Sequence, residues 1–251
     1  MKVSVITVCF NSEATIEDTL RSMQAQTHGN IEYIIIDGSS TDKTLQIIER
    51  YKHITAKVIS EPDKGIFDAM NKGIGLATGD IIGILNSDDF YKSADALSKV
   101  VNAFASGVSA VYGDIEYVKK NETKKVVRYW RSGIFSKIKM KYGWMPPHPA
   151  FFVRADVYKK YGTFNTQLRV SADYELMLRV LYKQKIKVAY LNKTLVCMRI
   201  GGNSNNSIKS RLKANNEDKL AWKINNLDYS FFTTILKPIR KIPQFIFKNK
   251  H

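Results

Sequence analysis

The sequence predicts an α/β protein in which a mostly parallel central sheet is covered by helices on both faces, with a basic helical extension at the C-terminal end. In the first half, short β-branched segments alternate with segments of helical periodicity. Loops rich in Asp, Asn, Ser and Gly follow the apolar segments directly. The chain has 251 residues, 44% of them hydrophobic, which is enough to bury a full core in one large domain and excludes disorder as its main state.

The first half repeats a unit of strand, loop and helix. Residues 3–8 are β-branched, which predicts a strand, and apolar side chains then recur at helical spacing over residues 16–23. Asp42 is the predicted N-cap of the second helix. The other predicted elements are a strand at 33–36, a helix at 45–51, a strand at 57–60, a helix at 67–76 and a strand at 80–85.

The second half is less regular. Short strands are predicted at 110–112 and 116–118, followed by a basic stretch over 119–141. Three prolines between positions 144 and 149 predict a fixed, extended loop. Then follow a strand at 150–153, a helix at 172–182, a strand pair or a strand and turn at 188–197, a loop at 201–206 and basic helix from 207. The chain therefore divides into the two halves of one domain, 1–115 and 116–206, and an extension, 207–251.

Charge is distributed unevenly along the chain. Residues 1–115 contain 10 Lys/Arg and 15 Asp/Glu, a net charge of −5, whereas residues 116–251 contain 29 and 8, a net charge of +21. Such asymmetry indicates an anionic partner, which could be nucleic acid, an anionic membrane surface or a phosphorylated substrate. The alternative is a lysine-rich solvated surface.

Cysteine and histidine usage excludes two classes of protein. The two cysteines and four histidines show no spacing typical of a disulfide framework or a structural zinc site. No apolar run approaches the roughly 20 residues that span a bilayer, and the first residues do not resemble a signal peptide. We therefore expect a cytoplasmic protein.

Asp88 and Asp89 are the sharpest local signal. Adjacent carboxylates at the end of an apolar strand repel each other unless a cation lies beside them. Magnesium and manganese suit such a site, because they need few protein carboxylates and take further oxygen ligands from phosphates. The alternative is that the pair caps the helix predicted to begin near Ser93.

Four motifs occur in a fixed order along residues 2–200. They are Val3-Ser4-Val5-Ile6-Thr7 with Asn11, Asp37-Gly38-Ser39 with Thr41-Asp42-Lys43-Thr44, Gly65 with Ala69 and Asn71, and Asn86-Ser87-Asp88-Asp89. Together they resemble the bacterial family-two glycosyltransferases of the Rossmann-like GT-A fold, of the kind used in surface polysaccharide and O-antigen biosynthesis. The sequence departs from the family at Asn86, where Asp is common.

The resemblance implies that region 1–115 binds a nucleoside diphosphate sugar. Asp37 would bond the nucleobase, while Asp88 would face the ribose or donor sugar and Asp89 would bind the divalent cation, Mn or Mg. Asp68 is explained equally well as an acid at a helix N-terminus. The remaining donor-site residues that the resemblance implies are Thr7, Cys9 and Asn11 around the base, Asp63 near the nucleoside, Lys64 near the diphosphate, and Asp68 and Asn71 on a helix facing the donor.

The resemblance places the catalytic base in region 116–206. Residues 171–179 are similar to a family segment in which an Asp at a helix start takes the proton of the acceptor hydroxyl, which assigns Asp173; the alternative is an ordinary helix N-terminal acid. Glu175 is expected to form an ion pair with Arg179. His148 is a candidate metal ligand or hydrogen-bond donor to a phosphate, and the alternative is a structural role. Trp144 and Met145 form either an acceptor platform or part of the core.

The predicted function is an inverting, hexosyltransferase-type glycosyltransferase. It would move a sugar from a nucleoside diphosphate sugar, more often UDP-linked in this branch, to a hydroxyl of a glycan or of a lipid-diphosphate-linked acceptor. Two alternatives are a nucleic-acid-binding protein and a nucleotide-binding pseudoenzyme. No known nucleic-acid module is present, and both Asp89 and Asp173, whose loss would indicate a pseudoenzyme, are retained.

The last residues form a basic amphipathic pattern. Apolar residues recur near helical spacing from Phe231 to Ile246 beside several lysines and arginines, and Pro238 and Pro243 divide the segment into short pieces. Such an element can lie on an anionic membrane surface, here the inner face of the cell membrane. The alternative is that it packs on the catalytic domain or on a second subunit of a homodimer.

Overall fold

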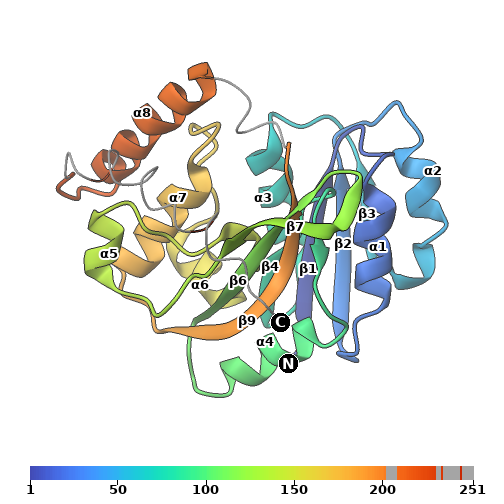
Figure 1. Ribbon diagram of the computed structural model, residues 1–251, viewed down its shortest axis with the longest axis horizontal. Helices are drawn as coiled ribbons and strands as arrows, with labels where there is room; N and C mark the ends of the chain where they lie inside the picture. Colours follow the sequence, from blue (N-terminus) through green and yellow to red (C-terminus); the bar gives the residue numbers. More distant parts are fainter. Residues whose placement is uncertain (202–207, 230–232, 234–243, 245–251) are drawn as a thin grey trace.

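The computed structural model describes residues 1–201, 208–229, 233 and 244 (Figure 1). A nine-stranded sheet forms its centre, and six strands run in one direction, namely β1, β2, β3, β4, β6 and β9. This confirms the mostly parallel sheet. In spatial order the strands are β3 (Lys57–Ser60), β2 (Ile31–Asp37), β1 (Val3–Cys9), β4 (Ile81–Ile84), β8 (Phe151–Arg154), β6 (Ala110–Lys119), β9 (Val188–Arg199) and β5 (Phe90–Tyr91), with β7 (Glu122–Trp130) paired to β6.

Helices cover both faces of the sheet, as predicted. Side chains alternate along β1, so Val3 and Val5 enter one core cluster while Ile6 and Val8 enter the other. The first cluster includes α1 (Ile16–Gln24), α2 (Thr44–Glu49) and α4 (Ala96–Phe104). The second includes α3 (Ile66–Leu76), α5 (Lys137–Lys141), α6 (Ala155–Tyr161), α7 (Ala172–Met177) and α8 (Ile208–Ile224). Short 3-10 turns occur at Lys52–Ile54 and His148–Ala150.

Two strand predictions are corrected in the second half. Residues 110–118 form part of a single strand, β6, because Asp114 is satisfied within the sheet by the Ser132 amide at 2.8 Å and the Tyr190 hydroxyl at 2.9 Å. The neighbouring Gly113 lets Leu195 approach closely, since a Cβ there would lie 2.6 Å from the Leu195 side chain. Residues 188–197 likewise belong to one strand, β9, rather than a strand pair.

Two helix predictions are also refined. The helix predicted at 172–182 is α7 followed by a π-helical segment, Leu178–Lys183. The second helix begins at Thr44, one residue earlier than predicted, so its N-cap residue is Lys43 and not the predicted Asp42, although the Asp42 carboxylate accepts the Thr44 amide at 2.9 Å. Among the helices of the described ranges, none is long and apolar enough to cross a membrane.

Glu32 links the amino ends of β1 and β2, at the edge of the sheet opposite the predicted site. Its buried carboxylate accepts hydrogen bonds from Ser4 Oγ at 2.5 Å and Thr78 N at 2.7 Å, and it pairs with Lys2 Nζ at 3.1 Å. Burial alone would raise the pKa of Glu32, but these hydrogen bonds outweigh it and hold the pKa at about 2. The charged form is therefore strongly favoured in the folded protein.

We expect Glu32→Gln to lower the free energy of unfolding by about 3 kcal/mol at pH 7, the value of a pKa lowered by about 2.5 units. A depressed folded-state pKa contributes stability above the unfolded-state value near 4.3, which is lost as the pH falls toward 2. Urea denaturation at pH 7 and at pH 2.5 checks this. The difference in the free energy of unfolding should fall from about 3 kcal/mol at pH 7 to about 1 kcal/mol at pH 2.5, where the folded-state carboxylate is still mostly ionised, and an equal difference at both pH values would contradict the account.

Candidate active site

Asp37 lies at the carboxyl end of β2 and is fully buried. Its carboxylate accepts hydrogen bonds from the Ser40 amide at 2.9 Å and Ser60 Oγ at 2.7 Å, and also from the Ser40 hydroxyl. Cys9 Sγ lies 3.5 Å from the same carboxylate, and burial together with the Asp37 charge raises the pKa of that thiol. Asp37 is thus a preformed anionic group beneath the loop that follows its strand.

The loops after β1 and β2 are joined to each other. Asn11 has a left-handed backbone (φ 47°), its side-chain oxygen accepts the Thr41 amide at 2.9 Å, and its own amide donates to Ser40 Oγ at 2.8 Å. Thr7, by contrast, is fully buried and accepts the Tyr33 hydroxyl at 3.0 Å. The structure therefore places Asn11 at the rim and Thr7 inside the core.

Asp63 approaches Asp37 from the loop after β3. A Cβ at Gly38 would lie 2.6 Å from Asp63 Oδ2, so a larger residue there would displace the Asp63 side chain. Phe10 lies beside them, and its side chain is 61% exposed although it follows a buried strand. Phe10 was not among the residues predicted from the sequence. Its signal was an aromatic residue in a polar loop between two residues already assigned to the site.

Lys64, Asp68 and Asn71 surround the start of α3. Asp68 lies in the first turn of α3, where it accepts the Lys64 amide at 3.0 Å and lies 3.8 Å from Lys72 Nζ, while the Lys64 side chain is exposed. The Asn71 side-chain nitrogen donates to the Phe164 carbonyl, and its side-chain oxygen accepts the Phe164 amide, each at 2.9 Å. Asn71 therefore joins the two halves of the domain, and its role in donor binding stays a prediction.

Asp88 and Asp89 follow β4 but differ in exposure. Asp89 is fully buried, and its Oδ1, like Asn86 Oδ1, has no hydrogen-bond partner among the described residues. Asp88 is half-buried, and Arg199 donates to its backbone carbonyl at 2.7 Å. Burial, and then the Asp88 charge, raise the pKa of Asp89 well above its ordinary value. The pair does not cap the next helix, which begins at Ala96.

The residues present fit a divalent cation that uses few protein ligands. Nowhere in the described part of the chain do three His, Cys, Asp or Glu side chains gather as a metal site. The unpartnered oxygens of Asp89 and Asn86, beside the half-exposed Asp88, are hard oxygen donors of the kind that magnesium and manganese prefer. Such an ion would complete its coordination with phosphate oxygens and water.

Asp173 and His148 line one small cavity. Ile84 and Phe164 also line this cavity. Ile84 is the last residue of β4 and lies two positions before Asn86. Burial lowers the pKa of His148, although the nearby Asp173 charge acts in the opposite direction, so the imidazole is neutral at pH 7. The sequence analysis did not predict that His148 would neighbour Asp173, and His148 as a metal ligand stays a prediction.

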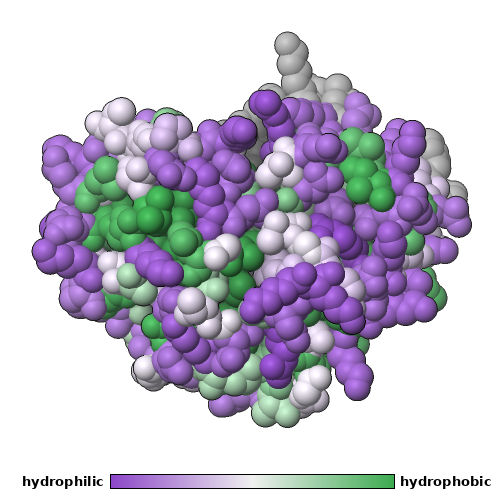
Figure 2. All heavy atoms as spheres, turned by 180° about the vertical axis from the view of Figure 1, so that it is seen from behind, coloured by the Kyte–Doolittle hydropathy of each residue, from purple (hydrophilic) through white to green (hydrophobic). Residues whose placement is uncertain are grey.

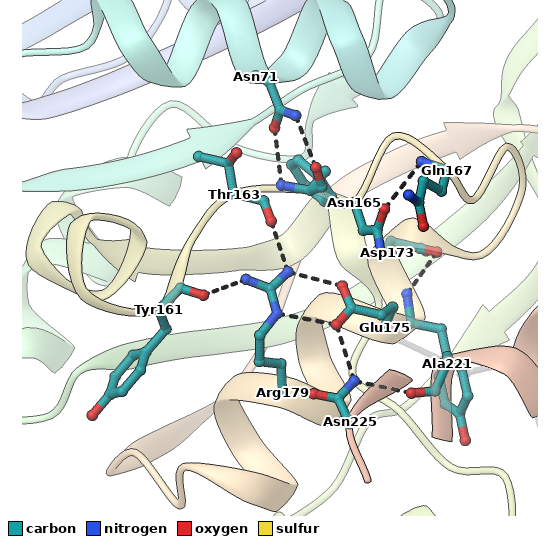
Figure 3. A network of polar contacts seen from close by, with 12 residues as sticks. Asn71, Tyr161, Thr163, Asn165, Gln167, Asp173, Glu175, Arg179, Ala221 and Asn225 are labelled. Carbon is teal, nitrogen blue, oxygen red and sulfur yellow. Dashed lines mark hydrogen bonds and ion pairs between the residues drawn. The ribbon is translucent and has the colours of Figure 1, made fainter. Parts of the chain in front are cut away.

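The surroundings of Asp173 form a polar network (Figure 3). Glu175 and Arg179 make the predicted ion pair, at 2.8 Å, and the Arg179 guanidinium also donates to the backbone of Tyr161 and Thr163.

Trp144 and Met145 are buried, as the core alternative required, and Trp144 donates to the Ser132 carbonyl at 3.0 Å.

Comparison with known proteins agrees with this architecture. Residues 4–162 match the profile of glycosyl transferase family 2, and the chain belongs to this family. It is 28% identical over 210 residues to a PGL/p-HBAD biosynthesis glycosyltransferase of Mycobacterium bovis, a match that covers 82% of this chain and 79% of that protein. It is 33% identical over 184 residues to an uncharacterized glycosyltransferase of Mycobacterium tuberculosis, covering 70% of this chain and 68% of the relative.

Solved structures share the fold. S. aureus TarS, crystallised with UDP-GlcNAc, superposes with a TM-score of 0.69 at 18% identity, over 93% of this chain and 69% of that one. The mannosyltransferase PcManGT of Pyrobaculum calidifontis, in complex with GDP-Man and Mn2+, gives 0.66 at 17% identity, over 96% and 69%. The fold of this chain is therefore GT-A, as the sequence predicted.

Proposed function

We propose that this protein is an inverting glycosyltransferase that moves a sugar from a nucleoside diphosphate sugar, UDP-linked, to a hydroxyl of a glycan or lipid-linked glycan in surface polysaccharide synthesis. The observation that carries the proposal is that Asp173 lies close to Ile84: both line one cavity of about 10 Å³, which is about the size of a single water molecule. It places a half-exposed carboxylate against the end of β4, the strand that leads into Asn86, Asp88 and Asp89. Base and donor loops then face one another across the same edge of the sheet.

In the proposed reaction, Asp173 accepts the proton of the acceptor hydroxyl as the oxygen forms a bond with the anomeric carbon. The bond from that carbon to the diphosphate oxygen breaks on the opposite face, so the stereocentre inverts. His148, neutral and beside Asp173, is suited to a hydrogen bond with the acceptor. Asp89, with the unpartnered oxygen of Asn86 beside it, would hold the divalent cation, which when bound would neutralise charge on the leaving diphosphate.

The proposed nucleobase pocket lies between Phe10, Asp37 and Asp63. The exposed Phe10 ring offers a face on which a base can stack, and Gly38 and Asp63 lie next to it. Asp37, already held by Ser40 and Ser60, would accept a base N–H through its remaining lone pair. This arrangement supports a specific role for the second motif and for the residue that the sequence analysis missed.

Phe10→Ala is expected to weaken UDP binding by about 1–3 kcal/mol, the usual value of stacking a base on an aromatic ring. Isothermal titration with UDP measures it. Phe10→Tyr keeps the ring and serves as the control, so it should bind like wild type. Unchanged UDP affinity of the alanine variant would place the base elsewhere.

A membrane surface is the proposed site of the acceptor. The predicted amphipathic segment from Phe231 to Ile246 lies almost wholly outside the described residues, but Thr233 is described and bonds the Lys141 carbonyl at 2.5 Å. The chain after α8 therefore meets α5, and both helices lie at the same end of the molecule (Figure 1). The side of the molecule seen from behind is mostly hydrophilic, with separate hydrophobic patches (Figure 2).

The exposed side chains of α5 and α8 suit an anionic membrane. Half of the strongly exposed large hydrophobic residues of the described chain belong to these helices or adjoin α5, and we call them the α5–α8 surface: Ile134, Ile138, Tyr142, Leu220 and Ile224. Exposed lysines accompany them at 137, 141, 213, 219 and 223. Apolar side chains among lysines bind anionic headgroups and insert shallowly.

The protein is expected to sediment with phosphatidylglycerol-containing vesicles at low salt, and less at moderate salt, because charge attraction is screened. Ile134→Glu with Ile138→Glu should reduce binding, as should ending the chain at Asp228. Val58→Glu, at another exposed apolar position, on β3 (40% exposed), is the control. Equal binding by all variants, binding by none, or a change in dimerisation alone on light scattering would contradict the membrane role.

A further inference from the structure

The catalytic-base candidate Asp173 is held indirectly by the helix of the C-terminal extension. Asp173 is half-exposed, and among the described residues its carboxylate accepts a hydrogen bond from the Tyr174 amide at 2.8 Å, within its own helix. The residues on either side of Asp173 are instead bonded to α8. Helix α8 is thus part of the structure around the site, although the sequence analysis treated it as an extension.

Glu217 makes the first of these contacts. It lies in α8, is only 9% exposed, and its Oε2 accepts the amides of Val170 at 2.7 Å and Ser171 at 2.9 Å. Ser171 is the N-cap residue of α7, but its hydroxyl makes no local cap and lies 3.3 Å from the Ala214 carbonyl of α8. A carboxylate from another helix therefore fixes the backbone where α7 begins, two residues before Asp173.

Two further contacts involve the residues that follow Asp173. Trp222 is fully buried and donates from Nε1 to the Tyr174 hydroxyl at 2.9 Å. Asn225, the residue directly after α8, donates to Glu175 Oε1 at 2.9 Å and so joins the end of this helix to the Glu175–Arg179 ion pair (Figure 3). Residues 170, 171 and 174 are bonded to α8 and residue 175 to Asn225, while the Asp173 carboxylate between them is half-exposed.

We infer that Glu217 is a positioning residue for the base: it sets the backbone at Ser171, and thereby the direction and reach of the Asp173 carboxylate toward the acceptor. This inference rests on the proposed function. General-base catalysis requires hydrogen-bond distance to the proton that is removed, and a displacement of about 1 Å costs up to about a hundredfold in rate. Loss of the Glu217 contact should therefore lower kcat and leave donor binding unchanged, because the donor pocket lies on the other half of the domain.

Three substitutions test this. Glu217→Ala removes the acceptor, Glu217→Asp keeps the charge but shortens the side chain by one methylene, and Glu217→Gln keeps an acceptor oxygen at the original reach. Asn216→Ala, an exposed neighbour on α8, is the matched control. The assay follows UDP released from UDP-glucose, UDP-galactose and UDP-N-acetylglucosamine with water as acceptor, together with UDP affinity and thermal unfolding.

The alanine and aspartate variants should lose about tenfold to a hundredfold in kcat with unchanged UDP affinity, whereas the glutamine and Asn216→Ala variants should stay near wild type. If the alanine variant does not fold, the aspartate variant makes the same comparison. In an Asp173→Asn background, Glu217→Ala should cost little further rate, because it acts through Asp173.

Wild-type kcat in both the alanine and aspartate variants would overturn the inference, as would an equal loss of rate with and without Asp173. Failure of this inference can be distinguished from failure of the proposed function. If Asp173→Asn leaves turnover normal, the proposed base is wrong; if it abolishes turnover while the Glu217 variants are unaffected, only the positioning role is wrong.

Discussion

Asp173→Asn is expected to lower the rate of sugar transfer by about a hundredfold or more while nucleotide binding and folding remain normal, because removal of a general base costs about 10²–10⁴ in rate. Asparagine has nearly the same shape, and the Tyr174 amide that bonds the carboxylate can bond the amide oxygen instead. The measurements are UDP release, UDP affinity by titration, and thermal unfolding of the purified variant.

Asp156→Asn provides the matched control, because Asp156 is an exposed acid in the first turn of a neighbouring helix, α6. It should not change the rate. Normal turnover by Asp173→Asn would move the base elsewhere, with Glu175 the next candidate. That candidate starts at a disadvantage, since Glu175 is buried and already bonded to Arg179 and Asn225.

Turnover is also expected to require a divalent cation, and Asp89→Asn should remove most activity. Two adjacent carboxylates and a diphosphate repel one another unless a cation lies among them. Asp88→Asn belongs in the same experiment, because Asp88 is half-exposed whereas Asp89 is fully buried with an unpartnered oxygen. Rates are measured after EDTA treatment and after addition of Mn2+ or Mg2+, and Mn2+ affinity is measured by electron paramagnetic resonance in the presence of UDP.

Wild-type protein should lose activity in EDTA and regain it with the added ion. Asp95→Asn is a suitable control, since Asp95 is an exposed acid a few residues further along the same segment. Full activity of the EDTA-treated wild type would show that the reaction does not depend on a metal. Normal Mn2+ affinity in both the Asp88 and Asp89 variants would place the ion at other residues.

Local sequence pattern was enough to predict the strands and loops of the first half of the chain. The strands around Val5, Ile35 and Val58 are apolar segments bounded by polar loops, and parallel strands bring their carboxyl ends to one edge. Asp37, Asn11 and Asp63 meet there as expected. The exposure of Phe10 was not predictable in this way, because an aromatic residue next to a strand usually enters the core.

Contacts between segments far apart in the chain were not predictable from pattern alone. Asn71 pairs with Phe164 across 93 positions, and Glu217 reaches Ser171 across 46. Neither contact produces a periodic pattern in the sequence. A polar residue on a helix is expected to face solvent unless its partner is known. The same limit explains why Thr7 was placed at the nucleotide pocket, although Tyr33 holds it in the core.

The anomeric configuration of the sugar released from a donor tests the central claim most directly. The protein is incubated with α-linked UDP-glucose, UDP-galactose, UDP-N-acetylglucosamine and GDP-mannose, and the freed sugar is followed by proton NMR before it mutarotates. We predict that at least one UDP sugar is hydrolysed and that its β anomer appears first, because water activated by Asp173 attacks opposite the diphosphate. Release of the α anomer first, or turnover of none of these donors, would contradict the account.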